Sequence, residues 1–145
     1  MKTILLCCLT CLTLHAAEFR IEAENSSDAK VIQDAACSAG AASTSDRAWQ
    51  PLLIADTPKA DGALSAWIHH RGGPIALKAK QADGKQNDVK WIWTKPEDWT
   101  WTRLGRFDQA TLGTQLYIIR GDAGSPQLDC VVLRSDASDT PPSIE

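Results

Sequence analysis

The chain lacks the excess of positive charge that proteins use to hold nucleic acids or anionic membranes. Its 145 residues carry 15 Lys and Arg against 18 Asp and Glu, which gives a formal net charge of −3. Basic patches are the electrostatic footprint of nucleic-acid and membrane-surface binding. We therefore expect neither nucleic acid nor a membrane among the partners of the folded domain.

A hydrophobic run long enough to cross a bilayer is also missing. Lys2 precedes an apolar stretch over residues 4–14, and the small residues Ala16 and Ala17 follow it. This stretch is shorter than the roughly 20 apolar residues of a transmembrane helix, and the order of its parts is typical of a secretory signal peptide. We predict that residues 1–17 are a signal peptide and that the mature chain is secreted, to the periplasm or the extracellular space.

Cysteine is scarce once the signal is set aside. Three of the five cysteines fall within residues 1–17, which leaves Cys37 and Cys130. Two cysteines in an exported protein can pair, but the sequence does not fix the distance between their Cα atoms. A disulfide and two buried thiols therefore both remain open.

Helical periodicity is almost absent, and short alternating segments separated by turn residues take its place. In the segment 19–24, Phe19, Ile21 and Ala23 alternate with charged residues and so lie on one face of a strand. No amphipathic crossover helix separates the segments. The pattern predicts an all-β, two-sheet antiparallel sandwich of the jelly-roll type. The other strands are expected over residues 29–33, 64–70, 75–80, 89–94, 99–104, 115–120 and 128–134.

The remaining segments set the domain boundaries. The Ala-, Ser- and Gly-rich run 35–46 is typical of a loop or an irregular edge. We expect one domain over residues 18–135, because 128 mature residues suffice for a single core. Residues 136–145 hold Ser, Asp and a Pro-Pro pair, and we predict that they form a disordered tail.

Three segments occur in an order that resembles a known family. Ile21-Glu22-Ala23-Glu24 opens the mature chain, Trp99-Thr100-Trp101 lies in its second half, and residues 128–133 close it. Together they resemble the galactose-binding-like jelly rolls, especially family 6 and family 35 carbohydrate-binding modules. The resemblance implies a non-catalytic module that recognises an extracellular polysaccharide or oligosaccharide by aromatic stacking. Whether a glycan-active enzyme accompanies it stays open.

The resemblance also implies a structural Ca²⁺ ion held by Glu22, Glu24 and Asp129. Glu22 and Glu24 are two residues apart on the expected strand, and so on one face. Carboxylates about 5 Å apart repel by about 3 kcal/mol at an effective dielectric near 20, and a hard divalent cation would reverse that cost. The alternative is a solvated face, where the repulsion falls below about 1 kcal/mol.

The sugar site is expected at a junction between a loop and a strand. In the related modules an aromatic at the position of Trp99 stacks on the sugar, and an asparagine at the position of Gln127 hydrogen-bonds it. Trp49 is the candidate for a second stacking aromatic. Gln127 keeps the amide but lengthens its reach, so a structural or protein-interaction jelly roll, tied by calcium and without a functional sugar cleft, is the alternative.

The other tryptophans are expected in the core, because all four lie within predicted strands. Trp91 and Trp93 are two residues apart and should share one face. Tryptophan is more often a large core residue than a binding residue when it lies in a strand. The four tryptophans are Trp67, Trp91, Trp93 and Trp101.

No catalytic constellation stands out. His69 and His70 are neighbours on a strand, so they point to opposite faces and cannot chelate one ion together. No serine lies in a Gly-x-Ser-x-Gly elbow. Glu97 and Asp98 precede a tryptophan in a way that is typical of a turn. We therefore expect no enzymatic activity.

Overall fold

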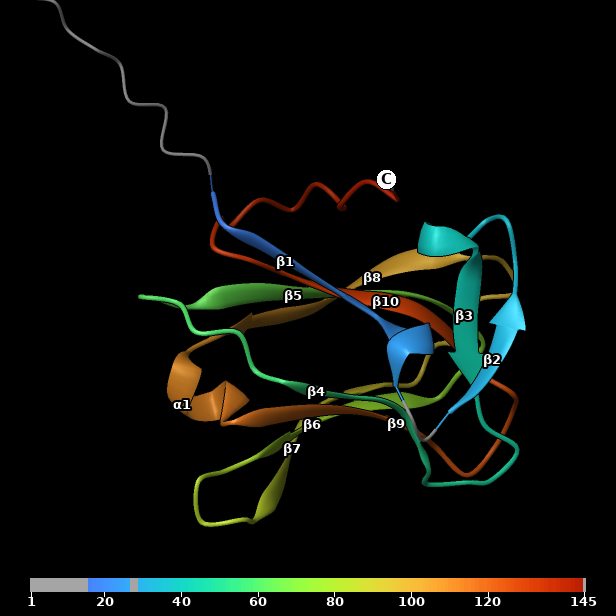
Figure 1. Ribbon diagram of the computed structural model, residues 1–145, viewed down its shortest axis with the longest axis horizontal. Helices are drawn as coiled ribbons and strands as arrows, with labels where there is room; N and C mark the ends of the chain where they lie inside the picture. Colours follow the sequence, from blue (N-terminus) through green and yellow to red (C-terminus); the bar gives the residue numbers. More distant parts are fainter. Residues whose placement is uncertain (1–15, 27–28, 145) are drawn as a thin grey trace, which may run out of the picture.

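Two antiparallel sheets pack face to face in the computed structural model, which describes residues 16–26 and 29–144 (Figure 1). The first, called sheet A, has the strand order β2-β3-β10-β5-β8, and β1 also pairs with β10. Its strands are β1 (Glu18–Glu22), β2 (Lys30–Gln33), β3 (Ala41–Thr44), β5 (Leu64–Arg71), β8 (Thr100–Phe107) and β10 (Gln127–Arg134).

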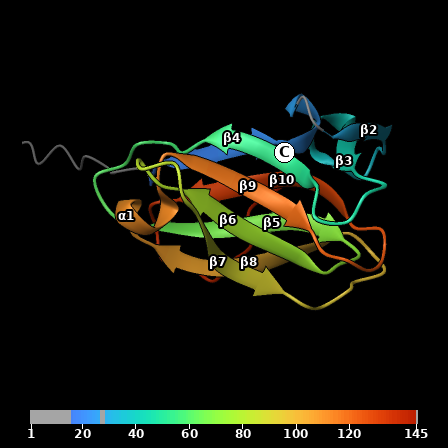
Figure 2. The same cartoon turned by 90° about the horizontal axis from the view of Figure 1, so that it is seen from below.

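The second, called sheet B, has the order β4-β9-β6-β7. Seen from below, β9 and β6 of sheet B lie across β10 and β5 of sheet A (Figure 2). The predicted all-β, two-sheet sandwich is therefore confirmed. The strands of sheet B are β4 (Pro51–Asp56), β6 (Ile75–Lys80), β7 (Gln86–Ile92) and β9 (Gln115–Arg120).

Helical structure among the described residues is limited to three short turns. They are η1 (Ala23–Asn25), η2 (Ser38–Gly40) and α1 (Gln109–Leu112). None of the helices in this part of the chain is long and apolar enough to cross a membrane. Residues 1–15 of the predicted signal peptide lie outside the described residues.

The core lies between the sheets and follows the alternation read from the sequence. Ala23 is fully buried in the core, and Phe19 and Ile21 pack against it, as predicted. In β5, Leu64, Ala66 and Ile68 face the core in the same way. The intervening residues of β5 face away from sheet B, on what we call the outer face of sheet A.

Two strands were not expected. β3 lies inside the run predicted to be a loop or irregular edge, and β4 was not predicted at all. Alanine and serine have a low propensity for strands. However, β3 pairs with both β2 and β10. Its small side chains are buried there, and the Ser43 hydroxyl donates to the Leu52 carbonyl (2.7 Å). Tertiary pairing therefore decides the strand where local propensity does not.

Residues 135–144 have no regular secondary structure, yet they run back along the outer face of sheet A (Figure 1). The start of this segment is tied to the start of β1. Ser135 N donates to the Ala17 carbonyl (2.9 Å), and the Ser135 hydroxyl accepts from Ala17 N (2.8 Å). Contacts also reach into the segment predicted to be a disordered tail, residues 136–145, where the Asp136 carbonyl accepts from Arg106 Nη1 (2.8 Å).

Candidate functional site

Three carboxylates gather where β10 changes its partner. β10 pairs with β3 through Gln127 and Leu128, and with β1 from Cys130 onward. Opposite β5 the register shifts between Leu128 and Cys130, so Asp129 is the extra residue of a β-bulge. Bulges re-aim a side chain relative to the regular ladder. The Asp129 side chain is fully buried at this junction.

The turn η2 supplies the hydrogen bonds that fix these carboxylates. Ser38 N donates to Asp129 Oδ2 (2.9 Å), and the Ser38 hydroxyl donates to Glu22 Oε1 (2.6 Å). His69 Nδ1 also lies 2.6 Å from Asp129 Oδ2. One oxygen of each carboxylate is thereby held. The other oxygens, Glu22 Oε2 and Asp129 Oδ1, are buried without a hydrogen-bond partner, as is Glu24 Oε2.

Glu24 reaches this cluster from a different element than expected. β1 ends at Glu22, and residues Ala23–Asn25 form the turn η1. The prediction that Glu22 and Glu24 lie on one strand is therefore wrong. Burial raises the pKa of Glu24, and the negative charges of Glu22 and Asp129 raise it further, against a backbone hydrogen bond that lowers it. The turn thus brings Glu24 within electrostatic reach of the other two carboxylates.

This donor set fits a hard divalent cation. Ligand oxygens of Glu22 and Asp129 lie within 4.8 Å of each other and of the Cys130 thiol. Glu24 is outside this group and contributes a further buried carboxylate oxygen without a partner. Buried carboxylate oxygens without partners are costly, and a cation that accepts oxygen ligands removes that cost. Ser38 leaves one oxygen of each carboxylate open, which is what a ligand set requires.

Both cysteines border the carboxylates as buried free thiols. Burial raises the pKa of Cys37 to about 12, with a further contribution from Asp129. The same causes raise the pKa of Cys130 well above its ordinary range. Both thiols therefore stay protonated at neutral pH, and the two cysteines do not form a disulfide in this structure.

Trp99 and Gln127, two of the predicted sugar-binding residues, are brought together by Arg71. Arg71 Nε donates to Gln127 Oε1 (2.6 Å), and the guanidinium lies 4.9 Å from the centre of the Trp99 ring. His69 stacks on Trp99 as well, with ring centres 5.3 Å apart. The Trp99 indole N–H donates to Asp34 Oδ2 (3.0 Å). Protein groups therefore already contact the Trp99 ring and accept its indole N–H, and the ring is half-buried.

Trp49, the third predicted residue, lies in a separate cluster with Trp91 and Trp93. The Trp91 and Trp93 rings are stacked, with centres 5.0 Å apart and planes 14° apart. The Trp49 ring meets Trp91 edge-on, at 5.8 Å and 77°. Trp93 is 68% exposed and Trp49 is 54% exposed. We call these three residues the tryptophan cluster.

The tryptophan cluster lies on the face of sheet B that is turned away from the core. Trp91 is opposite Ala76 in the ladder between β7 and β6, whereas the neighbours of Ala76, Ile75 and Leu77, are core residues. The expectation that Trp91 and Trp93 pack in the core is therefore wrong, because Trp93 is exposed and Trp91 is half-buried on this outward face. Trp67 is buried as expected, but in a second cluster with Cys130 and Val132, and Trp101 is only partly buried against that cluster.

Loops at one end of the sandwich hold the cluster in place. Trp49 has a positive φ of 64°, a conformation that is costly for a bulky residue. Its backbone N–H donates to the Arg120 carbonyl (3.0 Å). The Arg120 guanidinium also donates to the carbonyls of Ser45 and Gly124, which joins the two loops.

The loop that follows Trp93 is fixed by the turn between β5 and β6. Gly72 N donates to the Pro96 carbonyl (2.7 Å). A Cβ added at Gly73 would collide with the Thr94 carbonyl oxygen. The backbone beside Trp93 is therefore packed directly against a glycine.

Comparison with known proteins identifies the fold. No family model matches the chain, and no curated protein matches it. The chain resembles the crystal structure of a Podospora anserina GH26-CBM35 β-(1,4)-mannanase, with a TM-score of 0.59 and 16% identity, over 86% of this chain and 29% of that chain. It also resembles an exo-β-1,3-galactanase from Phanerochaete chrysosporium with galactose, with a TM-score of 0.53 and 12% identity, over 81% of this chain and 29% of that chain.

The chain therefore spans less than a third of the length of either solved protein. At these identities the likeness concerns the fold alone. The predicted jelly-roll fold is confirmed at that level.

Proposed function

We propose that this chain is an exported, non-catalytic carbohydrate-binding module and that its sugar platform is the tryptophan cluster. The observation that carries the proposal is the exposure of Trp93 and Trp49, two large aromatic side chains held on one surface by the loops around them. A pyranose ring presents a flat apolar face, and an aromatic platform matches it. Exposed tryptophans that are fixed in place are typical of binding hot spots.

The polar surroundings of the cluster suit a hydroxyl-rich ligand. The Trp91 indole N–H donates to Asp88 Oδ2 (3.2 Å), and Asp88 also pairs with Lys78 (3.0 Å). Within the described residues, no protein acceptor bonds the indole N–H groups of Trp49 and Trp93, so both are available to sugar hydroxyls. The two solved proteins that share the fold are, by their names, a mannanase with a CBM35 and a galactanase with bound galactose.

We assign Trp99 and Gln127 a supporting role instead of a direct one. Arg71 and His69 contact the ring of Trp99, and Arg71 also donates to the side-chain oxygen of Gln127. Trp99 is half-buried among these contacts, whereas Trp93 is mostly exposed. The more exposed ring is the better candidate for the sugar platform.

We further propose that Glu22, Glu24 and Asp129 hold a structural Ca²⁺ ion. The support is their three buried carboxylate oxygens that lack partners. Bound calcium would supply no catalytic chemistry and would neutralise charge between β1, η1 and β10. The chain's own contribution is Ser38, which orients Glu22 and Asp129.

The proposal is tested on a glycan array with the wild-type chain, Trp93→Ala and Trp99→Ala. Loss of a central aromatic from a binding site typically costs about 2 kcal/mol, so we expect Trp93→Ala to bind roughly 30-fold more weakly. Its melting temperature should change little, because the side chain is mostly exposed. Trp99→Ala should lower the melting temperature and leave glycan affinity largely unchanged.

Each other outcome has a defined meaning. If Trp99→Ala abolishes binding and Trp93→Ala does not, the platform is at Trp99. If no glycan binds, the chain is the structural or protein-interaction jelly roll that was the alternative. Release of reducing sugar by the wild-type chain would contradict a non-catalytic role.

A further inference from the structure

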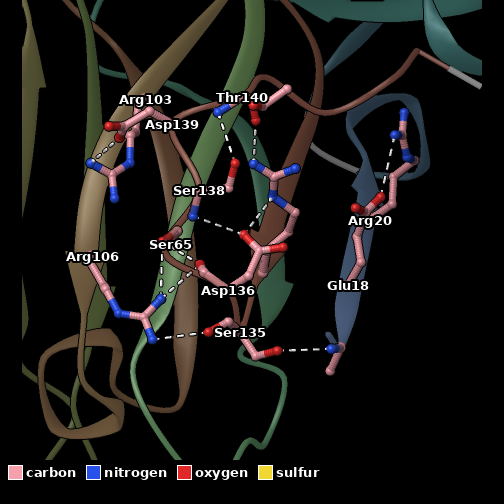
Figure 3. Close-up of polar contacts among 12 residues, drawn as sticks. Glu18, Arg20, Ser65, Arg103, Arg106, Ser135, Asp136, Ser138, Asp139 and Thr140 are labelled. Carbon is pink, nitrogen blue, oxygen red and sulfur yellow. Dashed lines mark hydrogen bonds and ion pairs between the residues drawn. The ribbon is translucent and has the colours of Figure 1, made fainter. Parts of the chain in front are cut away.

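Residues 135–144, which we call the C-terminal strap, are clamped against the outer face of sheet A by arginines from three strands (Figure 3). Arg106 Nη1 donates to the Asp136 carbonyl (2.8 Å), and Nη2 donates to the Ser135 carbonyl (2.9 Å). The Ser65 hydroxyl also donates to the Asp136 carbonyl (2.9 Å). The arginines are Arg20 from β1, Arg103 and Arg106 from β8, and Arg134 from β10.

The clamp continues along the strap to its end. Arg134 Nη2 donates to the Thr140 carbonyl, and Arg103 Nη1 pairs with Asp139 Oδ1 (3.1 Å). Arg20 donates to the carbonyls of Ser143 and Ile144. The arginines thus bind the strap chiefly through its backbone oxygens.

The composition of the strap matches this recognition. Arginine has five N–H donors and no acceptor. Pro141 and Pro142 have no backbone N–H and favour an extended conformation, so they present carbonyls only. Asp136 and Asp139 add negative charge opposite Arg134 and Arg103. The outer face of sheet A is therefore complementary to an extended, acidic peptide that is rich in hydrogen-bond acceptors.

Apolar side chains lie beneath the arginine side chains. Trp67, Cys130 and Val132 form a second buried cluster, separate from the core between the sheets, and Trp101 packs against it. The Arg134 guanidinium lies 5.6 Å from the centre of the Trp67 ring. Pro142 of the strap is buried. The face thus combines aromatic, apolar and cationic groups, a combination that occurs at binding surfaces.

The contacts that hold the strap allow it to be displaced by another segment. Asp139 is 88% exposed in its pair with Arg103, and exposed ion pairs contribute little to stability. The strap belongs to no sheet, so its release breaks no strand pairing of β10, which ends at Arg134. Its two hydrogen bonds to Ala17 place the hinge after Ser135.

We propose that the arginine-lined outer face of sheet A is a docking surface for an extended acidic segment of a partner protein, and that the strap occupies it as an intramolecular ligand. A tethered segment competes at an effective concentration in the millimolar range. A partner segment must therefore bind more tightly than the strap or act when the strap is weakened. This docking surface is separate from the tryptophan cluster, so the proposal does not depend on sugar binding.

The test uses the full chain and a fluorescein-labelled peptide with the sequence of residues 135–144. The double variant Asp136→Asn with Asp139→Asn weakens the chain's own strap. We expect this variant to bind the peptide about threefold more tightly than the wild type does, because the tethered competitor has lost two exposed ion pairs. A peptide carrying the same two substitutions is the control and should bind about threefold more weakly. Arg103→Gln with Arg106→Gln in the double variant should abolish binding.

Hydrogen exchange of residues 136–144 shows whether the strap is released. Increased exchange in the double variant together with peptide binding supports the docking surface. Increased exchange without peptide binding overturns it, because an uncovered surface that binds no acidic peptide is not a docking site. Unchanged protection also overturns it, because the strap would then be a fixed part of the fold. Equal affinity for both peptides, with stronger binding of a sulfated polysaccharide, would identify a polyanion surface instead.

Discussion

Replacement of Glu24 by Gln should stabilise the chain in a chelator and destabilise it in calcium. Without an ion, the ligand oxygens of Glu22 and Asp129 lie within 4.8 Å of each other, and Glu22, Glu24 and Asp129 each have a buried oxygen without a partner. Two unit charges at that distance repel by about 3.5 kcal/mol at an effective dielectric of about 20. Glu24 adds to this repulsion, and its raised pKa reflects both burial and that interaction.

The expected magnitude is smaller than the pairwise repulsion, because Glu24 is only partly buried. We expect removal of its charge in chelator to recover about 1 kcal/mol, or about 4 °C in melting temperature. In saturating calcium the same substitution removes a charged ligand. If the affinity for the ion falls tenfold, the stabilisation by the ion falls by about 1.4 kcal/mol. The sign of the effect therefore inverts between the two conditions.

The assay is thermal unfolding at pH 7 in chelator and in calcium, with Glu18→Gln as the control. Glu18 is a carboxylate on the same strand, pairs with Arg20 and is 42% exposed in its side chain. Its substitution should have the same small effect in both conditions. A shift of the same sign for Glu24→Gln in both conditions would refute the cation site.

The pH dependence gives an independent check on Glu24. Because the fold raises its pKa above the ordinary value of 4.5, the folded chain binds more protons than the unfolded chain between the two pKa values. Stability in chelator should therefore fall as the pH rises through that window. Glu24→Gln should lack this part of the pH dependence.

Three further substitutions test other parts of the structure. Gly73→Ala should weaken glycan binding several-fold on the array, because the added Cβ displaces the Thr94 carbonyl beside Trp93. Trp67→Ala should cost about 3–5 kcal/mol in urea unfolding, because it removes a buried aromatic, and an unchanged midpoint would contradict its buried position. The wild type should lose stability as the pH falls below about 6.5, because burial lowers the pKa of His70 and the fold holds it neutral. His70→Gln should lack this loss, which melting curves at pH 7 and pH 5 measure.

The inward-facing residues of the long strands were predictable because alternation is a local property. Phe19 and Ile21 needed only their spacing to be placed on the core side of β1, and Ala23, which follows in η1, is also buried in the core. His69 and His70 were separated onto opposite faces by the same rule. His69 stacks on the tryptophans of the outer face, and His70 Nε2 bonds the Thr102 hydroxyl at 2.8 Å.

Residues whose surroundings come from distant parts of the chain were predicted less well. The bulge at Asp129 depends on how β10 shares its edges among β3, β1 and β5, and no local pattern encodes it. The resemblance indicated Asp129 as a ligand, whereas Ser38 and His69 were missed as its hydrogen-bond partners. Ser38 lies in a small-residue run whose structure is set by pairing with other strands.

The position of Trp99 was predictable from the sequence, but its surroundings were not. Its position at a loop-to-strand junction was read correctly, since β8 begins at Thr100. The side chains that contact its ring come from β5. They are His69 and Arg71, which lie 30 and 28 residues earlier in the sequence. A family position alone therefore does not show whether a ring is open to a ligand.

Trp91, near the end of β7, and Trp93, just after it, could have been assigned to the correct face from the residue between them. Trp91 and Trp93 share one face of the strand, and Ile92 occupies the other. A strand with apolar residues on both faces can turn only one of them to the core of a two-layer sandwich. Ile92 pairs with Ile75 and is buried in the core cluster, so the two tryptophans face away from it. The smaller apolar residue marks the core face here, and the two larger aromatics are left on the surface where we place the sugar.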